Sequence, residues 1–214
     1  MSKKKFLLVC GSTVDIDILT AEAARADVLM AVDSGLDKLQ EAALVPDILI
    51  GDMDSTRENT ELLPEDVRIL RFEPEKDDTD TALAIGQAIE EGADEITVLG
   101  ATGGRLDHFL GNIEALRIAL DAGVPCVMMD RCNRIRLIDM PCLIPKRSRY
   151  ISLLPYTDTV RNVRLRGFKY SLDCEDLHRG KTVGISNEIV AHKGYIAFTS
   201  GILTLIESDD DGRV

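Results

Sequence analysis

Short apolar runs alternate with segments of helical spacing along roughly the first 130 residues of the chain. Unbroken apolar runs are typical of strands that are buried on both faces. We expect such strands at residues 6–10, 28–32, 48–50, 67–72, 96–99 and 124–129. Apolar residues at helical spacing predict helices at residues 16–26, 36–44, 79–91 and 106–122. This alternation indicates an α/β fold with a doubly wound, mostly parallel sheet.

The pattern changes after Cys132, where short apolar runs are separated by proline, glycine, asparagine and aspartate. Val163 and Leu165 alternate with Arg164 and Arg166, which is the period of a strand with one buried face. We expect strands at residues 135–138, 150–154, 160–165, 189–191, 195–198 and 202–206. The sequence therefore predicts an α/β domain at residues 1–135, followed by a small antiparallel β-sandwich or β-barrel domain at residues 136–214.

Aspartate clusters follow three of the predicted strands directly. In open α/β sheets, ligands bind beyond the carboxyl ends of the strands, and the carboxyl ends of parallel strands share one edge. We therefore expect the clusters to meet at that edge. Their members are Asp33, Asp52, Asp54, Asp77, Asp78 and Asp80.

A glycine-rich turn follows the predicted strand at residues 96–99. Gly103 and Gly104 would let backbone N–H groups approach a phosphate closely at the start of the next helix, and Arg105 can bind phosphate oxygens through two hydrogen bonds. The turn matches neither the Walker A pattern nor the GxGxxG dinucleotide pattern. It indicates phosphate binding without either standard motif.

Net charge and ligand type point to a metal ion at this edge. The formal net charge of −12 disfavours nucleic acid and anionic membranes as partners, since both require Lys and Arg to neutralise phosphates. Six neighbouring carboxylates would repel one another without a cation. Oxygen ligands favour Mg²⁺ or Mn²⁺ over zinc, and Mg²⁺ commonly bridges carboxylates and substrate phosphates. A nucleotide or another phosphorylated substrate is therefore expected.

Each motif also has a structural interpretation when it is taken alone. Residues 77–80 can cap a helix and complement its dipole. Residues 33–35 can form an ordinary strand-to-helix turn, and Asp52 with Asp54 can form an Asx turn. Glycine pairs such as Gly103 and Gly104 are common in turns. The functional interpretation depends on the conjunction of the motifs.

The cysteines and the N-terminus bear on the compartment. The five cysteines form no CxxC pair, so we expect reduced thiols rather than a disulfide framework. A basic N-terminus precedes an apolar run that stops at Cys10, which is too short for a signal peptide core or a membrane span. We expect a cytoplasmic protein.

Together these motifs closely resemble the thiamine pyrophosphokinase family in order and spacing. The residues that carry the resemblance in the first domain are 33–35, 51–55, 76–80 and 102–108. In the second domain, residues 167–170 and 184–188 resemble the C-terminal motifs of that family, and residues 202–205 resemble its closing strand. The resemblance covers nearly the whole chain.

The resemblance implies an enzyme that transfers the terminal diphosphate of ATP to the hydroxyethyl group of thiamine, giving thiamine diphosphate and AMP. It implies an α/β domain that binds the nucleotide, a β domain that completes the thiamine pocket, and a homodimer with the pocket at its interface. Mg²⁺ would assist the transfer. In that reaction charge builds on the oxygens of the diphosphate, where Mg²⁺ and Arg105 would stabilise it.

The resemblance also implies roles for individual residues. The set that handles Mg²⁺ and diphosphate, with Asp33 close by, would be Asp52, Asp54, Asp77 and Asp80. The nucleotide site would consist of Gly103, Gly104, Arg105, Asp107 and His108. The residues that face thiamine would be Ser186 and Asn187. Apart from the resemblance, the chemistry suggests a carboxylate such as Asp77 or Asp80 as acceptor of the alcohol proton, although metal ligation would lower its basicity.

Two departures from the family pattern leave alternatives open. The chain has no tryptophan, although some family members stack thiamine against one. Phe198, Tyr195 or an aliphatic residue could make that contact, but structural packing is the favoured interpretation of each. Ser171 stands where many relatives have a proline.

Two alternative functions stay open beside the one that the resemblance implies. They are a pyrophosphokinase for another hydroxymethyl heterocycle, such as a pterin alcohol, and a non-catalytic module that senses nucleotide or thiamine.

Overall fold

The computed structural model describes residues 3–51, 63–71 and 78–210. The chain forms two compact units, which are Met1–Arg131 and Cys132–Val214. We call them the α/β unit and the β unit. Among the described residues, no helix is both long enough and apolar enough to cross a lipid bilayer.

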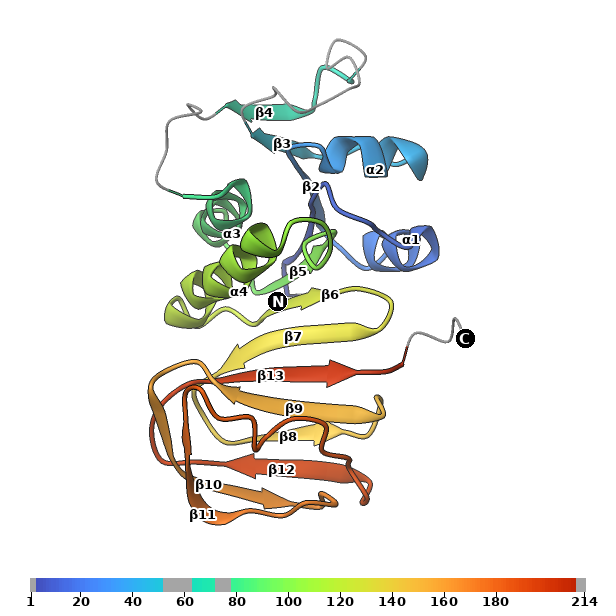
Figure 1. Ribbon diagram of the computed structural model, residues 1–214. Helices are drawn as coiled ribbons and strands as arrows, with labels where there is room; N and C mark the ends of the chain where they lie inside the picture. The colour runs from blue at the N-terminus through green and yellow to red at the C-terminus, as the bar shows by residue number, and fades with distance from the viewer. Residues whose placement is uncertain (1–2, 52–62, 72–77, 211–214) are drawn as a thin grey trace. The chain divides into compact units, whose positions relative to one another are not determined.

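The α/β unit contains a parallel sheet whose strands lie in the order β4-β3-β2-β1-β5-β6 (Figure 1). These strands are β1 (Lys5–Val9), β2 (Val28–Val32), β3 (Ile48–Gly51), β4 (Arg68–Arg71), β5 (Glu95–Leu99) and β6 (Cys126–Met129). The helices between them are α1 (Ile16–Ala23), α2 (Gly35–Glu41), α3 (Asp80–Glu90) and α4 (Leu106–Asp121). The predicted alternation of strands and helices is confirmed, with differences of a few residues at element ends.

The sheet of the α/β unit is covered by helices on both faces, with α1 and α2 on one side and α3 and α4 on the other (Figure 1). Alternate residues of each strand point to opposite faces, so both faces must be apolar when both are covered. Leu7 and Val9 of β1 belong to a core cluster with Leu19 of α1 and Leu36 of α2. The doubly wound arrangement is therefore confirmed.

The β unit contains two antiparallel sheets. One has β13 between β7 and β9, and the other has the order β11-β10-β12-β8. The strands are β7 (Asn133–Ile138), β8 (Cys142–Pro145), β9 (Tyr150–Pro155), β10 (Thr159–Arg166), β11 (Asp173–His178), β12 (Lys193–Ala197) and β13 (Leu203–Ser208). One core cluster joins residues of both sheets, such as Leu153 and Leu205 from the first with Val163 and Ile196 from the second. The predicted antiparallel β fold is confirmed, and of the two alternatives, sandwich and barrel, two sheets around one core correspond to the sandwich.

The sequence pattern failed at three places in the β unit. The strand expected at residues 189–191 is wrong, because only Ile189 forms a single bridge, with Phe168. Strand β11 was missed because it lies at a sheet edge and only Leu177 of its residues is buried. Strand β8 was missed because it is short and ends in a proline. Edge strands need little apolar sequence, so periodicity does not reveal them.

Candidate active site

Asp33 follows strand β2 directly and has the left-handed backbone conformation, with a φ of 50°. Its N–H donates to the carbonyl oxygen of Ile50 at 2.7 Å, which ties it to the neighbouring strand β3. Gly35 follows in close contact with β1, because a Cβ there would lie 1.8 Å from the carbonyl oxygen of Val9. The absence of a side chain at Gly35 thus allows the turn after β2 to pack directly on the backbone of β1.

Asp33 and Asp80 lie at the same edge of the sheet, near the thiol of Cys10. The Cys10 sulfur is 3.5 Å from the Thr81 hydroxyl at the start of α3. The pKa of Cys10 is raised to about 11, mainly by burial; the hydrogen bond with Thr81 lowers it, and the charges of Asp80 and Asp33 add smaller increases. The structure therefore places Asp33 and Asp80 near the same thiol, which stays protonated at neutral pH, where it is a poor metal ligand.

The N-terminus of α3 is capped by Thr79. Its hydroxyl oxygen accepts a hydrogen bond from the N–H of Ala82 at 3.2 Å. Asp80 is in the first helical turn rather than at the cap position. Thr79 rather than an aspartate therefore caps the helix, whereas Asp80 in the first turn still fits the alternative that the cluster complements the helix dipole.

Three members of the predicted metal set, Asp52, Asp54 and Asp77, lie outside the described residues. Within residues 3–51, 63–71 and 78–210, no group of three or more His, Cys, Asp or Glu is arranged around a common metal position. The four-aspartate set therefore stays a prediction. The carboxylates of Asp33 and Asp80 fit it chemically, because hard oxygen donors suit Mg²⁺.

The glycine turn between β5 and α4 packs against the chain that follows β1. A Cβ on Gly103 would lie 2.6 Å from the hydroxyl oxygen of Ser12, and Gly104 has a φ of 79°. The buried side chain of Asn112 in α4 donates to the carbonyl oxygen of Ala101 at 3.0 Å. Sequence reasoning missed Ser12 and Asn112. The only signal for Asn112 was a polar residue on the buried face of a helix.

Arg105 and Asp107 form a pair with two hydrogen bonds at the start of α4. The distances are 2.6 Å from Nη2 to Oδ2 and 3.1 Å from Nε to Oδ1. Asp107 also accepts a hydrogen bond from the N–H of His108 at 2.9 Å. These contacts, led by the one from Arg105, lower the pKa of Asp107 to about 2. Both side chains are more than 60% exposed, so the guanidinium remains accessible to a ligand.

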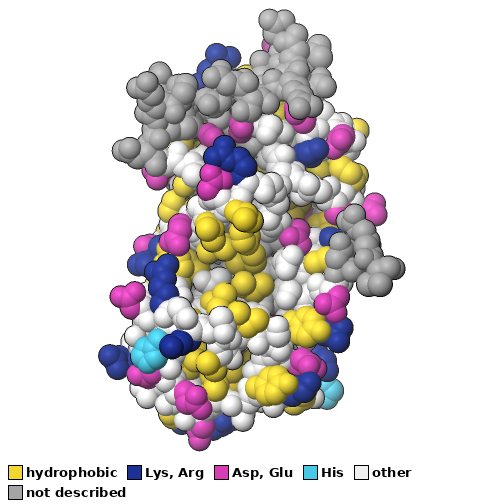
Figure 2. Space-filling view, viewed as in Figure 1, with side chains coloured by type: hydrophobic (Ala, Val, Ile, Leu, Met, Phe, Trp, Pro, Cys, Tyr) yellow, Lys and Arg dark blue, Asp and Glu magenta, His cyan; other side chains and the backbone are white. Residues whose placement is uncertain are grey.

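Apolar side chains are exposed beside this turn. Leu106 and Leu110 of α4 are 77% and 60% exposed. Figure 2 shows hydrophobic side chains gathered on the face of the α/β unit where α4 lies. Exposed apolar surface of this kind often marks a binding surface.

Ser186 and Asn187 belong to the β unit and differ in environment. Ser186 is exposed, whereas the side chain of Asn187 is buried and hydrogen-bonded to the backbone of Tyr170. The two aromatic candidates also differ, since Phe198 is a core residue and Tyr195 is 39% exposed. Tyr170, at 60% exposed, belongs to the motif at residues 167–170 but was not considered for the stacking contact.

Two family models match the chain in succession. The model described as "Thiamin pyrophosphokinase, catalytic domain" matches residues 19–128, and the model described as "Thiamin pyrophosphokinase, vitamin B1 binding domain" matches residues 142–203. The first match lies within the α/β unit and the second within the β unit.

Individual relatives carry the same name. A thiamine pyrophosphokinase of Bacillus subtilis (strain 168) is 34% identical over 186 residues, which is 85% of this chain and 87% of the relative. A crystal structure of thiamine pyrophosphokinase from Bacillus subtilis has a TM-score of 0.87 at 32% identity, covering 97% of this chain and 100% of that chain. The enzyme structure from Geobacillus thermodenitrificans gives 0.83 at 31% identity, with coverage of 98% and 100%.

Proposed function

The chain belongs to the thiamine pyrophosphokinase family, and we propose from this membership that it transfers the terminal diphosphate of ATP to the hydroxyl of thiamine. The products are thiamine diphosphate and AMP. The observation that carries the proposal is the match of both family domains, in order, to the two units of the chain. It is supported by the position of Asp33 and Asp80 at one sheet edge.

In this proposal the acidic edge of the sheet handles Mg²⁺ and the diphosphate. Asp80 acts there with Asp52, Asp54 and Asp77, and Asp33 lies close by. The bound metal supplies positive charge that stabilises the oxygens of the group in transfer. The carboxylates hold that charge in place and fix the position of the diphosphate relative to the attacking hydroxyl.

The glycine turn takes the phosphates of the nucleotide. Backbone N–H groups around Gly103 and Gly104, at the start of α4, offer donors to phosphate oxygens. Arg105 adds a guanidinium that exchanges part of its contact with Asp107 for the ligand, and His108 lies beside them. Asp107 is too weak a base to accept the proton of the alcohol, because its pKa is lowered to about 2.

The β unit receives thiamine, with contacts from Ser186 and Asn187. We also propose a homodimer, which the exposed apolar residues Leu106 and Leu110 support, since a soluble monomer seldom exposes neighbouring large apolar side chains. A light-scattering mass of two chains is the expected result. The five free cysteines support a cytoplasmic location.

The test is product analysis after incubation with ATP, Mg²⁺ and one acceptor at a time. We expect equimolar AMP and thiamine diphosphate when thiamine is present, and no AMP without an acceptor. ADP as the nucleotide product, or no turnover, would contradict the proposal. Turnover with a pterin alcohol and none with thiamine would assign the chain to a different acceptor.

A further inference from the structure

The segment at residues 184–187 runs along β9 with one extra residue. The N–H of Leu153 donates to the carbonyl oxygen of Gly184 at 2.9 Å, and Ile151 and Asn187 exchange backbone hydrogen bonds at 2.8 and 2.9 Å. One residue of β9, Ser152, therefore lies opposite two residues of the segment. This is the geometry of a β-bulge, a feature that often redirects a side chain next to a binding site.

The extra residue is accommodated by Ser186, which has a left-handed φ of 56°. For a residue other than glycine this conformation costs about 1 kcal/mol or more, so the surroundings must hold it. The N–H of Ser186 donates to the hydroxyl oxygen of Ser152 at 3.0 Å. Ser152 is only 8% exposed, whereas Ser186 is exposed. A buried hydroxyl thus holds an exposed one in a strained position.

The side-chain amide of Asn187 is used within the protein. Its oxygen accepts from the N–H groups of Tyr170 at 3.0 Å and Glu188 at 2.9 Å, and its nitrogen donates to the carbonyl oxygen of Tyr170 at 2.7 Å. The residue is 6% exposed. Two acceptor positions and one of two donors are therefore occupied by backbone groups. The amide fixes the peptide groups on both sides of Tyr170.

The loop that carries Tyr170 is held at neighbouring points as well. The N–H of Lys169 donates to the carbonyl oxygen of Glu188 at 2.8 Å, and its ammonium group pairs with the Glu188 carboxylate at 2.7 Å. Tyr170 is 60% exposed, and the Lys169 ammonium lies 5.6 Å from the centroid of its ring. An exposed aromatic ring on a fixed backbone is preorganised for contact with a ligand.

We propose that Ser152 and Asn187 are positioning residues for the acceptor: Ser152 holds Ser186, and Asn187 holds Tyr170, so that an exposed hydroxyl and an exposed ring are presented to the acceptor heterocycle. Neither Ser152 nor the amide of Asn187 contacts the acceptor. This inference rests on the proposed function and refines it, because Asn187 changes from a contact residue to a supporting one.

The test is a double-mutant cycle on Ser152 and Ser186 with steady-state kinetics for both substrates. Ser152→Ala should raise KM for thiamine about five- to tenfold, as expected for the loss of one hydrogen bond that holds the competent conformation, with KM for ATP unchanged. Ser186→Gly adopts the left-handed conformation without strain but lacks the hydroxyl. In that background, Ser152→Ala should change KM for thiamine less than about twofold, because its effect passes through Ser186.

Separate variants test whether Asn187 positions Tyr170 for the acceptor. Asn187→Ala should raise KM for thiamine by about tenfold and lower the unfolding midpoint, since it leaves buried backbone groups of Tyr170 without their partner. Tyr170→Ala removes only an exposed ring and should raise the same KM in a stably folded protein. The Tyr170→Ala variant therefore tests the role of the Tyr170 ring even if Asn187→Ala does not fold.

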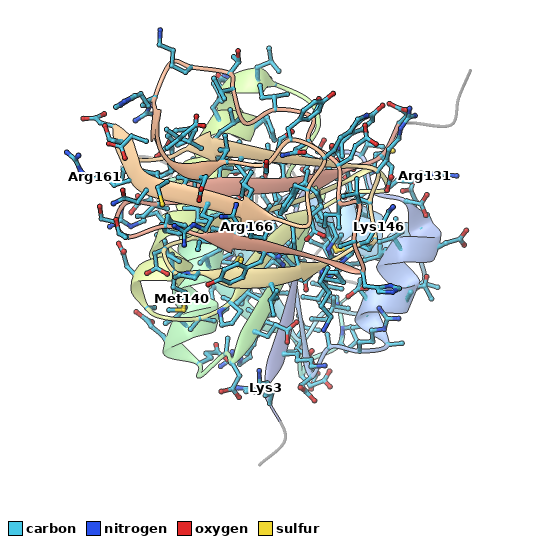
Figure 3. All side chains as sticks on the ribbon, turned by 90° about the horizontal axis from the view of Figure 1, so that it is seen from below. Lys3, Arg131, Met140, Lys146, Arg161 and Arg166 are labelled. Carbon is cyan, nitrogen blue, oxygen red and sulfur yellow. The ribbon has the colours of Figure 1, made fainter. Side chains whose placement is uncertain are left out.

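Asn162→Ala is the matched control. Asn162 is also left-handed, with a φ of 55°, and its amide donates to the Thr199 hydroxyl at 2.9 Å. The control lies away from the proposed site. Figure 3 shows Arg161, which precedes Asn162, well apart from Lys146, and the charge of Lys146 helps to lower the pKa of Glu188, the residue after Asn187. The control should lose stability without a change in KM for thiamine.

Three results separate the hypotheses. If folded Ser152→Ala keeps its KM for thiamine, or if the two serine substitutions are additive, the role of Ser152 is overturned. An unchanged KM in Tyr170→Ala overturns the role of the Tyr170 loop and hence of Asn187. Absence of thiamine-dependent AMP in the unmodified protein would instead refute the proposed function, so the two failures are distinguishable.

Discussion

Asp33 in the α/β unit and Ser186 in the β unit share a left-handed backbone but are held in it by different means. Around Asp33 the chain packs backbone on backbone, and Gly35 touches the carbonyl oxygen of Val9 where any Cβ would collide. Around Ser186 the backbone also packs closely, because a Cβ on Gly184 would lie 2.1 Å from the carbonyl oxygen of Leu153, but here the hydroxyl of Ser152 adds a side-chain hydrogen bond. The site in the α/β unit should therefore be sensitive to added atoms at Gly35, and the Ser186 segment also to the removal of a polar group.

The largest expected effect is that of Gly35→Ala in the α/β unit. The new Cβ would lie 1.8 Å from the backbone oxygen of Val9, so a strand or the turn has to move. We expect a loss of about 3 kcal/mol or more in the free energy of unfolding, or no folded protein. Urea unfolding measures it.

Gly86→Ala in α3 is the matched control for this substitution. A Cβ there meets no atom within 4 Å, and alanine should stabilise the helix by about 0.5–1 kcal/mol. Equal effects of the two substitutions would contradict the close-packing account of the acidic edge.

The second-largest effect is expected for Asp80→Asn, and it should be a loss of activity rather than of stability. Loss of one carboxylate at the metal and diphosphate position should lower kcat by about 10²-fold or more, since one charge that acts on the transition state is removed. The thermal unfolding midpoint should stay within a few degrees. Steady-state AMP formation measures the first effect.

Glu90→Gln, at the other end of α3, provides the comparison for Asp80→Asn. It should retain full activity. Unfolding of Asp80→Asn without loss of activity in the remaining folded fraction would favour a purely structural role for Asp80.

Glu207→Ala tests the dependence of the β unit on polar contacts. Glu207 is 1% exposed, and its carboxylate lies 3.4 Å from Arg136 and 3.3 Å from Arg147. Removing it leaves partly buried guanidinium groups without their counter-charge, which should cost about 2 kcal/mol in the free energy of unfolding.

Asp210→Ala removes one partner of an exposed pair with Arg149 in the same unit. It should change the free energy of unfolding by less than about 0.5 kcal/mol. A similar value for Glu207→Ala would show that burial of the charge is not what matters in the β unit.

The smallest effect concerns pH and the Arg105–Asp107 pair. The folded pKa of Asp107 is about 2, below its ordinary value of 3.8, so the pair stabilises the fold above the ordinary value and loses this contribution as pH falls toward 2. The difference in unfolding midpoint between the unmodified protein and Asp107→Asn should therefore shrink between about pH 4 and pH 2. A difference that is constant over this range would contradict the pairing.

Periodicity and glycine motifs revealed most of the α/β unit, because its function-bearing turns follow continuous apolar strands. Asp33, Asp80 and the glycine turn could all be predicted from their place after such strands. The charges of Asp33 and Asp80 both act on the thiol of Cys10, as expected for residues at one edge of a parallel sheet. The sequence pattern did not reveal Asn112, because its contribution is one hydrogen bond to the backbone of Ala101, eleven residues earlier in the chain.

The β unit was less accessible to sequence reasoning. Strand β11 is polar and at a sheet edge, and the segment ending at Asn187 forms a single isolated bridge, with Ile151. Ser152 looks like any serine in a strand, and its partner Ser186 is 34 residues away in the chain. Support that consists of single side-chain hydrogen bonds between distant residues leaves no periodic signal.

Which bond of ATP is broken tests the central claim most directly. Diphosphate transfer breaks the link between the α- and β-phosphorus and leaves the β–γ link intact. With Mg²⁺ and thiamine, β,γ-methylene ATP should therefore still give AMP and a thiamine carrying the methylene-bridged diphosphonate, whereas α,β-methylene ATP should give no product. Phosphorus NMR of the two reactions identifies the products. Turnover of α,β-methylene ATP to its diphosphate analogue, with none of β,γ-methylene ATP, would contradict diphosphate transfer.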